Sequence, residues 1–257
     1  MTGVQTCALP ISEVILAAVC RFRTLEGACN TVIQAIQLGG LGLARIELID
    51  EMQIRAINTH SKMTLAEAPT LFLEFHGSEV SAADAVAQFK ALAVEEGALD
   101  YQWAEAEDDR RRLWKARHDA YFAVKTTWPG KDVLATDVCV PISQLAACVM
   151  QTKADIEHAG LIAPIVGHAG DGNFHCSVVS DGSIAAERAK VETFLKRLSQ
   201  RALDMDGTCT GEHGVGQGKI GYMSAEHGAG VDVMRRIKQT LDPLGIFNPG
   251  KILPAPT

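Results

Sequence analysis

The stretch APIVGHAGDGNFHCSVVS, residues 163–180, decides the fold that we expect for this chain. Two apolar runs flank a glycine-rich centre, which predicts a β-hairpin. Asp-Gly is the favoured central pair of a type I′ turn, so Asp171 and Gly172 are expected to form that turn. In this register residue 168 pairs with residue 175, and His168 and His175 become cross-strand partners on one face.

Outward from this hairpin, the chain alternates between strand-like and helical patterns. The strands are short and half polar, unlike the continuous aliphatic runs of a buried parallel sheet. We therefore expect an α+β fold, with a ferredoxin-like antiparallel sheet covered on one face by helices and followed by a C-terminal helical segment. Strands are expected at 14–22, 43–48, 68–75, 99–104 and 135–140, and helices at 24–38, 51–58, 82–96, 105–125, 141–158, 185–203 and 231–241, with Thr24, Asp50 and Ser81 as N-caps and Pro141 in a first turn.

Composition narrows the classes of protein that this chain can represent. A length of 257 residues with 47% hydrophobic residues is enough for a substantial core. The net charge of -7 argues against a nucleic-acid partner, because such proteins usually carry a basic face. The sequence has no apolar run of about 20 residues, so no transmembrane helix is predicted. Gly167, Gly170 and Gly172 precede a strand rather than a helix, which argues against a dinucleotide-binding loop.

The first residues and the cysteines also carry information. Residues 1–11 have neither a basic n-region nor a long apolar run, and we interpret them as a non-native, adapter-like leader before a domain at 12–257. Seven cysteines without a C-x-x-C pair predict reduced, buried thiols in a cytosolic-type compartment. Cys176 and Cys209 are an alternative pair of soft metal ligands, although histidine and glutamate are better placed.

A second glycine-rich stretch, TCTGEHGVG at 208–216, completes a candidate metal site. Cross-strand residues have Cβ atoms about 4.5–5.5 Å apart, so two imidazoles at 168 and 175 can reach one ion. Glu212 lies between glycines where the backbone can approach a cofactor, and it is the expected third ligand. Two histidines and a carboxylate indicate a divalent Lewis-acid site for zinc or manganese, with iron as a further option. The alternative is that the histidines flank a turn without binding metal.

Three more residues are candidates for substrate chemistry. His213 follows Glu212 directly and points elsewhere, so we assign it to proton transfer; the alternative is a loop histidine bonded to backbone. Arg117 is the best carboxylate clamp, because a guanidinium can hold a carboxylate through two parallel bonds. The alternative for Arg117 is a helix-surface arginine paired with Asp119 or another acid. Lys131 is a weaker second cation.

Five motifs occur in order along the chain: LWKARHDA (113–120), TDVCVPISQL (136–145), GHAGDGNFH (167–175), CTGEHGVGQGK (209–219) and FNPGKIL (247–253). Together they resemble the C-terminal domain of the flavin-linked 2-hydroxyacid dehydrogenases. The resemblance runs from Ser12 to Pro254 and is greatest to the cytochrome-linked members that oxidise D-lactate, while other members act on D-2-hydroxyglutarate or glycolate.

The resemblance implies a role for each site residue. Hydride would pass from the substrate Cα to flavin N5 while metal coordination lowers the pKa of the substrate hydroxyl. The implied metal ligands are His168, His175 and Glu212. The implied base is His213, and Arg117 holds the substrate carboxylate while Asn173 supports the substrate site. Asn248, with Glu212 and His213, is implied to lie near the flavin.

The resemblance also sets expectations for cofactor, partners and location. FAD would be bound mainly by an N-terminal domain without a counterpart in this sequence, so we expect the chain alone to be inactive. The electron acceptor would be cytochrome c, a quinone or an electron-transfer flavoprotein, and a homodimer is compatible with the family. The location would be cytoplasmic, peripheral to the inner membrane in a bacterium, or mitochondrial in a eukaryote.

Oxidation of D-lactate to pyruvate is thus the leading function. The alternatives within the family are D-2-hydroxyglutarate and glycolate dehydrogenases, and an extra cation such as Lys131 would favour the former. A different class is a stand-alone metallohydrolase that uses the same His-His-Glu set to activate water. A non-catalytic ferredoxin-like scaffold is the third class, and it predicts no bound metal.

Overall fold

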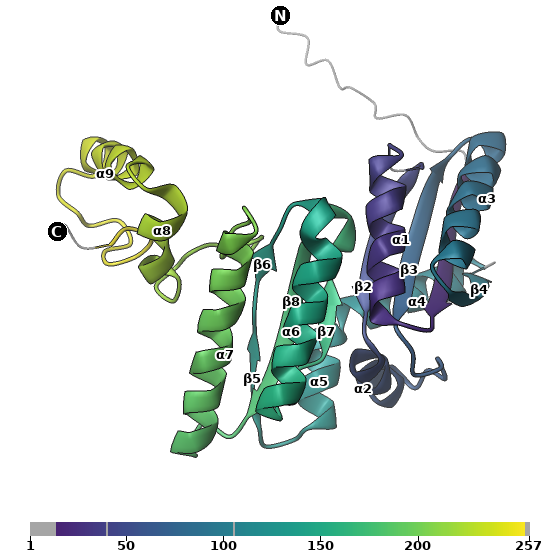
Figure 1. Cartoon of the computed structure of the whole chain (residues 1–257), viewed down its shortest axis with the longest axis horizontal. Helices are drawn as coiled ribbons and strands as arrows, with labels where there is room; N and C mark the ends of the chain where they lie inside the picture. Colours follow the sequence, from purple (N-terminus) through teal and green to yellow (C-terminus); the bar gives the residue numbers. More distant parts are fainter. Residues whose placement is uncertain (1–13, 40, 105, 255–257) are drawn as a thin grey trace, which may run out of the picture.

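The computed structural model describes residues 14–39, 41–104 and 106–254, so the expected leader at 1–11 lies outside the described residues. Strands and helices alternate along the chain (Figure 1). The elements are β1 (Val14–Phe22), α1 (Leu25–Gln37), β2 (Leu43–Ile49), α2 (Glu51–Ser61), β3 (Thr70–Gly77), α3 (Glu79–Glu95), β4 (Ala98–Ala104), α4 (Glu107–His118), α5 (Ala120–Thr127), β5 (Asp132–Ala135), β6 (Val138–Cys139), η1 (Ile142–Gln144), α6 (Leu145–Ala159), β7 (Ile165–Gly167), η2 (Ala169–Asp171), β8 (Asn173–Ser180), α7 (Ala185–Asp204), η3 (Ile220–Tyr222), α8 (Met223–His227) and α9 (Gly230–Leu241).

The first half of the chain forms the expected ferredoxin-like unit. Its strands are ordered β4-β1-β3-β2 and all pair antiparallel. With α1 after β1 and α3 after β3, this is the βαββαβ arrangement, to which α2 is added between β2 and β3. Antiparallel pairing fits the half-polar strands of the sequence.

The second half repeats the same arrangement. β6, α6, β7, β8 and α7 follow one another, and β8 lies between β6 and β7. An isolated bridge between Cys139 and Thr208 supplies the fourth strand position beside β6. The order is therefore Thr208-β6-β8-β7, which corresponds to β4-β1-β3-β2 of the first half.

A short ladder joins the two halves into one eight-stranded sheet. β2 pairs with β7 through Leu48 with Gly167 and Ile49 with Val166. The main core lies between the sheet and α1, α3, α6 and α7, which share one face in Figure 1. A second core on the opposite face includes residues of α2, α4 and α5, so the expectation of helices on one face only was wrong.

Local capping chemistry explains several boundaries. Thr24 and Asp50 accept hydrogen bonds from Gly27 N and Gln53 N, so both predicted N-caps are confirmed. Ser78, not Ser81, caps α3, and Ser81 is its reciprocal partner in a capping box. The single helix expected at 105–125 is divided into α4 and α5 at Asp119.

Two further predictions around the site were wrong in detail. The strand expected at 135–140 is interrupted between β5 and β6, and both pieces pair with β8. The two-residue type I′ turn does not form, because Val166, not His168, lies opposite His175. A five-residue connection replaces the turn, with a 3₁₀ turn at Ala169–Asp171 and Gly172 at φ 75°. The register differs by two residues, which keeps both histidines on the expected face.

The C-terminal segment forms a small helical unit, as expected. α8 and α9 lie beyond α7 and away from the sheet (Figure 1). The tail returns to the glycine-rich loop, where Ile252 N donates a hydrogen bond to Gly216 O at 2.8 Å. Within the described ranges, the helices are too short or too polar to cross a bilayer.

Candidate metal and substrate site

Three side chains from the two glycine-rich stretches converge on one point. The ligand-type atoms of His168, His175 and Glu212 all lie within 4.8 Å of one another. Glu212 Oε1 is 3.1 Å from His175 Nε2 and 3.5 Å from His168 Nε2. The structure therefore brings together the three predicted ligands, although the turn between the histidines differs from the predicted one.

Hydrogen bonds on the far side of each ring orient both histidines. His175 Nδ1 donates to Thr136 O at 2.9 Å, and His168 Nδ1 donates to Glu47 Oε1 at 2.7 Å. Because a carbonyl and a carboxylate only accept, the proton of each neutral ring lies on Nδ1, and the Nε2 lone pair faces Glu212. This pattern is typical of metal-binding histidines, so the donor set fits a divalent cation.

The two rings differ in their electrostatic surroundings. The hydrogen bond to Glu47 raises the pKa of His168 above its ordinary value. Burial lowers the pKa of His175, which favours its neutral form. Burial also raises the pKa of Cys176 and Cys209 to about 12. Among the described residues, neither thiol belongs to a group of possible metal ligands.

Asp137 organises the loop that carries Glu212. Its side chain is only 3% exposed and accepts hydrogen bonds from the backbone N–H groups of Glu212 at 3.1 Å and His213 at 2.9 Å. Thr210 Oγ1 and Asn173 Nδ2 donate to the same carboxylate at 3.0 and 2.9 Å. The loop therefore closes around one buried negative charge.

His213 and Asn173 both lie beside the cluster. His213 is mostly exposed, with Nε2 3.6 Å from Glu212 Oε1 and its ring centroid 5.3 Å from that of His175. Asn173 is buried, and its Nδ2 donates to Asp137, which in turn holds the loop that carries Glu212. In the part of the chain that the structure describes, Asn173 Oδ1 has no hydrogen-bond partner. An exposed imidazole next to the ligands can exchange a proton with a substrate.

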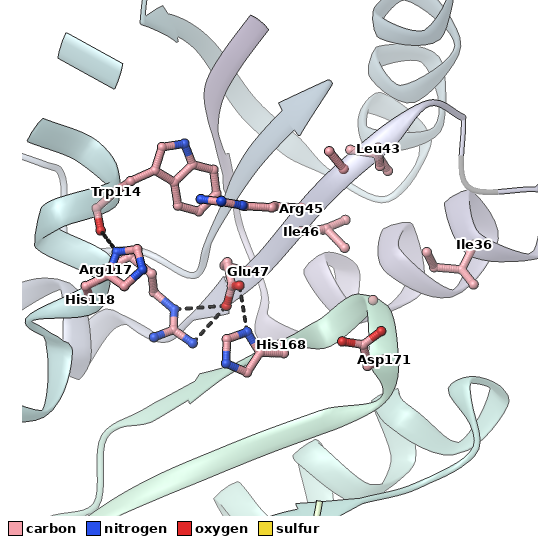
Figure 2. Close-up of a pocket in the computed structure, with 12 residues that line it drawn as sticks. Ile36, Leu43, Arg45, Ile46, Glu47, Trp114, Arg117, His118, His168 and Asp171 are labelled. Carbon is pink, nitrogen blue, oxygen red and sulfur yellow. Dashed lines mark hydrogen bonds and ion pairs between the residues drawn. The ribbon is translucent and has the colours of Figure 1, made fainter. Parts of the chain in front are cut away.

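Arg117 faces a cavity of about 340 Å³ next to His168 (Figure 2). It is 12% exposed and donates from Nε to Glu47 Oε2 at 2.9 Å, while Asp119 pairs with Lys115. Arg117 is therefore neither on the surface nor paired with Asp119, but it does pair with another acid, as the alternative allowed. Arg45 enters the same cavity, with its guanidinium carbon 5.1 Å from the centre of the Trp114 ring.

Comparison with known proteins identifies the family. The sequence profile described as "FAD linked oxidases, C-terminal domain" matches residues 11–252. The chain belongs to this family.

Relatives of this FAD linked oxidase domain carry related names. This chain is 45% identical over 244 residues to "Probable D-lactate dehydrogenase, mitochondrial" of Danio rerio, and the match covers 95% of this chain and 49% of that protein. It is 41% identical to "D-lactate dehydrogenase [cytochrome], mitochondrial" of Arabidopsis thaliana, covering 93% and 42%. "Glycolate oxidase subunit GlcD" of Escherichia coli (strain K12) is 27% identical, with 95% and 48% covered. The chain thus spans about half the length of these relatives.

Solved structures show the same fold in distant proteins. A 4-ethylphenol oxidase from Gulosibacter chungangensis matches with a TM-score of 0.72 at 17% identity, covering 95% of this chain and 55% of that one. A p-cresol methylhydroxylase matches with a TM-score of 0.67 at 12% identity, covering 94% and 53%. At these identities the likeness concerns the fold alone.

Lys131, expected at the substrate site of this oxidase domain, lies elsewhere. Lys131 precedes β5 and pairs with Asp181 at 3.4 Å, at the end of β8 that is farthest from the cluster. At 3.3 Å per residue, this end lies roughly 16 Å from His175 along the strand. Asn248 lies in the C-terminal unit, where it accepts a hydrogen bond from Lys251.

Sequence reasoning missed three residues that shape the site of this domain. Glu47 and Asp137 are buried acids in strand-like runs, and a buried acid usually has a paired partner. That signal could have identified them as special, but their partners depend on pairing between distant strands. The sequence pattern predicts only a strand position for Arg45, because its contact with Trp114 depends on where α4 packs.

Gly211 offers a test of how tightly the Glu212 loop is packed. A Cβ at this position would lie 1.8 Å from Asn173 Nδ2 and 2.7 Å from Asp137 Oδ1. Gly211→Ala is therefore expected to lower the free energy of unfolding by about 1–3 kcal/mol and to weaken metal binding about tenfold. Gly218→Ala in the same loop is the control, because a Cβ there meets nothing within 4 Å. Thermal melts and Mn²⁺ titration of both variants measure the difference; equal behaviour would show that the loop is loosely packed.

Proposed function

We propose that this chain is the substrate- and metal-binding half of an FAD-dependent dehydrogenase that oxidises D-lactate to pyruvate. The observation that carries the proposal is the convergence of His168, His175 and Glu212 beside His213 and the cavity of Arg117. The names of the relatives, D-lactate dehydrogenase in Danio rerio and Arabidopsis thaliana, support this substrate. They give no support to the metallohydrolase alternative.

Each residue has a defined task in this proposal. Zn²⁺ or Mn²⁺ held by His168, His175 and Glu212 would supply Lewis acidity toward the substrate hydroxyl. His213 accepts the hydroxyl proton, for which its exposed imidazole next to the ligands is suited. Arg117, which lines the cavity, binds the substrate carboxylate.

A flavin and an electron acceptor would complete the proposed reaction. FAD would supply the hydride acceptor, and we place Asn248 of the C-terminal unit on the flavin side. Cytochrome c is the proposed electron acceptor, following the names of the cytochrome-linked relatives. Those relatives are named as mitochondrial, and we propose the same location for a eukaryotic source; they do not support association with a bacterial inner membrane.

The test compares this chain with the longer protein that carries the same domain. The longer protein is expected to contain flavin whose visible absorbance is lost on addition of D-lactate, and to reduce a dye with D-lactate as the preferred substrate over glycolate. The chain of 257 residues alone is expected to bind metal but to lack flavin and turnover. Flavin-independent hydrolysis of an ester or amide at this site, or a preference for glycolate, would contradict the proposal.

One observation favours D-2-hydroxyglutarate as a second candidate substrate. Arg45 lines the cavity together with Arg117, so it could meet a second carboxylate. Charge-assisted hydrogen bonds contribute about 1.5–3 kcal/mol, so Arg45→Met is expected to raise KM for D-2-hydroxyglutarate at least about tenfold if this substrate is used. KM for D-lactate, which has no second carboxylate, serves as the internal control. Equal changes for both substrates would reject this candidate.

A further inference from the structure

We infer that Glu47 is a positioning residue that fixes the metal-binding His168 and the carboxylate-binding Arg117 relative to each other. The inference deepens the proposed function and rests on it for the role of Arg117. Glu47 is 6% exposed and lies in β2, next to the ladder that joins the two halves. Since Leu48 pairs with Gly167, the next position of the antiparallel register places residue 47 opposite residue 168.

One oxygen of Glu47 acts on the metal site. Oε1 accepts the Nδ1 proton of His168 at 2.7 Å, and the Nε2 atom of the same ring lies 3.5 Å from Glu212 Oε1. Holding the proton on Nδ1 leaves the Nε2 lone pair available for a cation. His175 obtains the same orientation from a backbone carbonyl, so only His168 depends on a side chain for its tautomer.

The other oxygen of Glu47 acts on the substrate side. Oε2 accepts from Arg117 Nε at 2.9 Å and lies 2.8 Å from Arg117 Nη2. Figure 2 shows the guanidinium of Arg117 and the ring of His168 both directed at this one carboxylate. A buried arginine needs such a counter-charge, and contacts through both Nε and Nη2 fix the guanidinium of Arg117 beside the cavity that this residue lines.

The charge and the geometry of a carboxylate are both required here. Two acceptor oxygens satisfy two donors on opposite sides, which no neutral side chain of the same size can do. In Glu47→Gln, the amide NH₂ must face either His168 Nδ1 or Arg117 Nε. Because the guanidinium of Arg117 is always charged, the amide oxygen is expected to face Arg117, and the NH₂ group then faces His168. This forces the His168 ring into the tautomer with the proton on Nε2, and that nitrogen can then no longer bind a cation.

Glu74 provides a matched control for this substitution. It is also 6% exposed and lies on the neighbouring strand β3, where it pairs with Arg45 in the β2–β3 ladder. Its Oε1 contacts His76 Nε2 at 2.8 Å and Arg45 Nε at 3.8 Å, so its partners are different from those of Glu47. Glu74→Gln therefore makes the same chemical change at the same burial without touching His168 or Arg117.

The experiment is a calorimetric titration of the 257-residue chain with Mn²⁺, combined with ¹⁵N NMR of the histidine rings at a pH where they are neutral. Glu47→Gln is expected to bind Mn²⁺ about 10–100-fold more weakly, as found for partners of metal-bound histidines. Glu74→Gln is expected to stay within twofold of the wild type. The wild-type spectrum is expected to show His168 protonated on Nδ1, and Glu47→Gln is expected to lose this signature.

Unchanged Mn²⁺ affinity in a folded Glu47→Gln protein would overturn the inference, as would equal losses in both variants. If Glu47→Gln does not fold, the wild-type spectrum alone still tests the inference. A proton on His168 Nε2 would contradict the assigned hydrogen bond from Nδ1 to Glu47. These measurements need neither flavin nor substrate. A failure of D-lactate oxidation in the longer protein would therefore refute the proposed function while leaving the test of Glu47 and His168 intact.

Discussion

Replacing His175 by alanine is expected to abolish binding of the divalent metal and to lower kcat/KM for D-lactate by about three orders of magnitude. His175 is the most buried of the three ligands and is held within β8, with Nδ1 fixed by Thr136 O. Its loss leaves one imidazole and one half-exposed carboxylate, which is too few ligands for a specific site.

Metal content and Mn²⁺ affinity are measured on this chain, and kcat/KM on the longer protein. His158→Ala is the control, because His158 is an exposed residue near the end of α6 and lies outside the cluster. A thermal melt separates loss of metal from loss of fold. Retention of one tightly bound metal per chain in His175→Ala would show that the cluster is not the metal site.

The second large effect is expected for Asp137→Asn. The asparagine presents an NH₂ group to donors that now share a carboxylate, among them the N–H groups of Glu212 and His213. Leaving two part-buried N–H groups with poor partners costs about 3 kcal/mol, which lowers Tm by roughly 6–12 °C for a domain of this size. Asp84→Asn on the exposed face of α3 is the control and is expected to change the free energy of unfolding by less than about 0.5 kcal/mol.

The effect of Asp137→Asn should depend on pH. Burial alone raises the pKa of Asp137, but the hydrogen bonds from His213 N–H and Asn173 and the charge of Lys219 outweigh it and lower the pKa from 3.8 to about 2. A folded-state pKa below the unfolded-state pKa stabilises the protein above the unfolded-state value, and this contribution, on the order of 2 kcal/mol, is lost as pH falls from about 4 to about 2. Unfolding curves of both proteins should therefore converge in acid; a constant difference down to pH 2 would contradict the assigned hydrogen bonds.

Local chemistry allowed much of the fold to be predicted from the sequence. Thr24 and Asp50 start helices because their side chains accept the first free N–H groups, which requires no knowledge of the rest of the chain. The half-polar strands likewise indicated an antiparallel sheet. The duplication of the ferredoxin-like unit was not predicted, since the fourth strand of the second half is reduced to a single bridge at Thr208.

The turn between the two histidines shows why local rules fail next to a packed core. Asp-Gly favours a two-residue turn, but Val140 N donates to Gly172 O at 3.0 Å, and β6 pairs with Asn173 on the other side of β8. These contacts from a distant segment determine where the strand begins. The three predicted ligands still lie together despite this error, because a difference of two residues restores the same face of the strand.

Glu47 and Asp137 could not be assigned from the sequence for a related reason. Each is a single acid in a strand-like run, and its role depends on a segment that is far away along the chain. Glu47 meets His168 across 121 positions, and Asp137 meets His213 across 76. Spacing within a motif reveals ligands that are neighbours in the chain, whereas the residues that orient those ligands come from elsewhere.

The two repeated halves, joined by the pairing of β2 with β7, contribute different residues to the candidate site. Arg45, Trp114 and Arg117, which line the candidate substrate cavity, belong to the first half. The second half supplies the three candidate metal ligands and His213. Glu47 of the first half links the two sets, because it contacts both Arg117 and His168. We therefore expect substitutions at Arg45 to change the choice of hydroxyacid without changing the candidate ligands, whereas a substitution at Glu47 affects both.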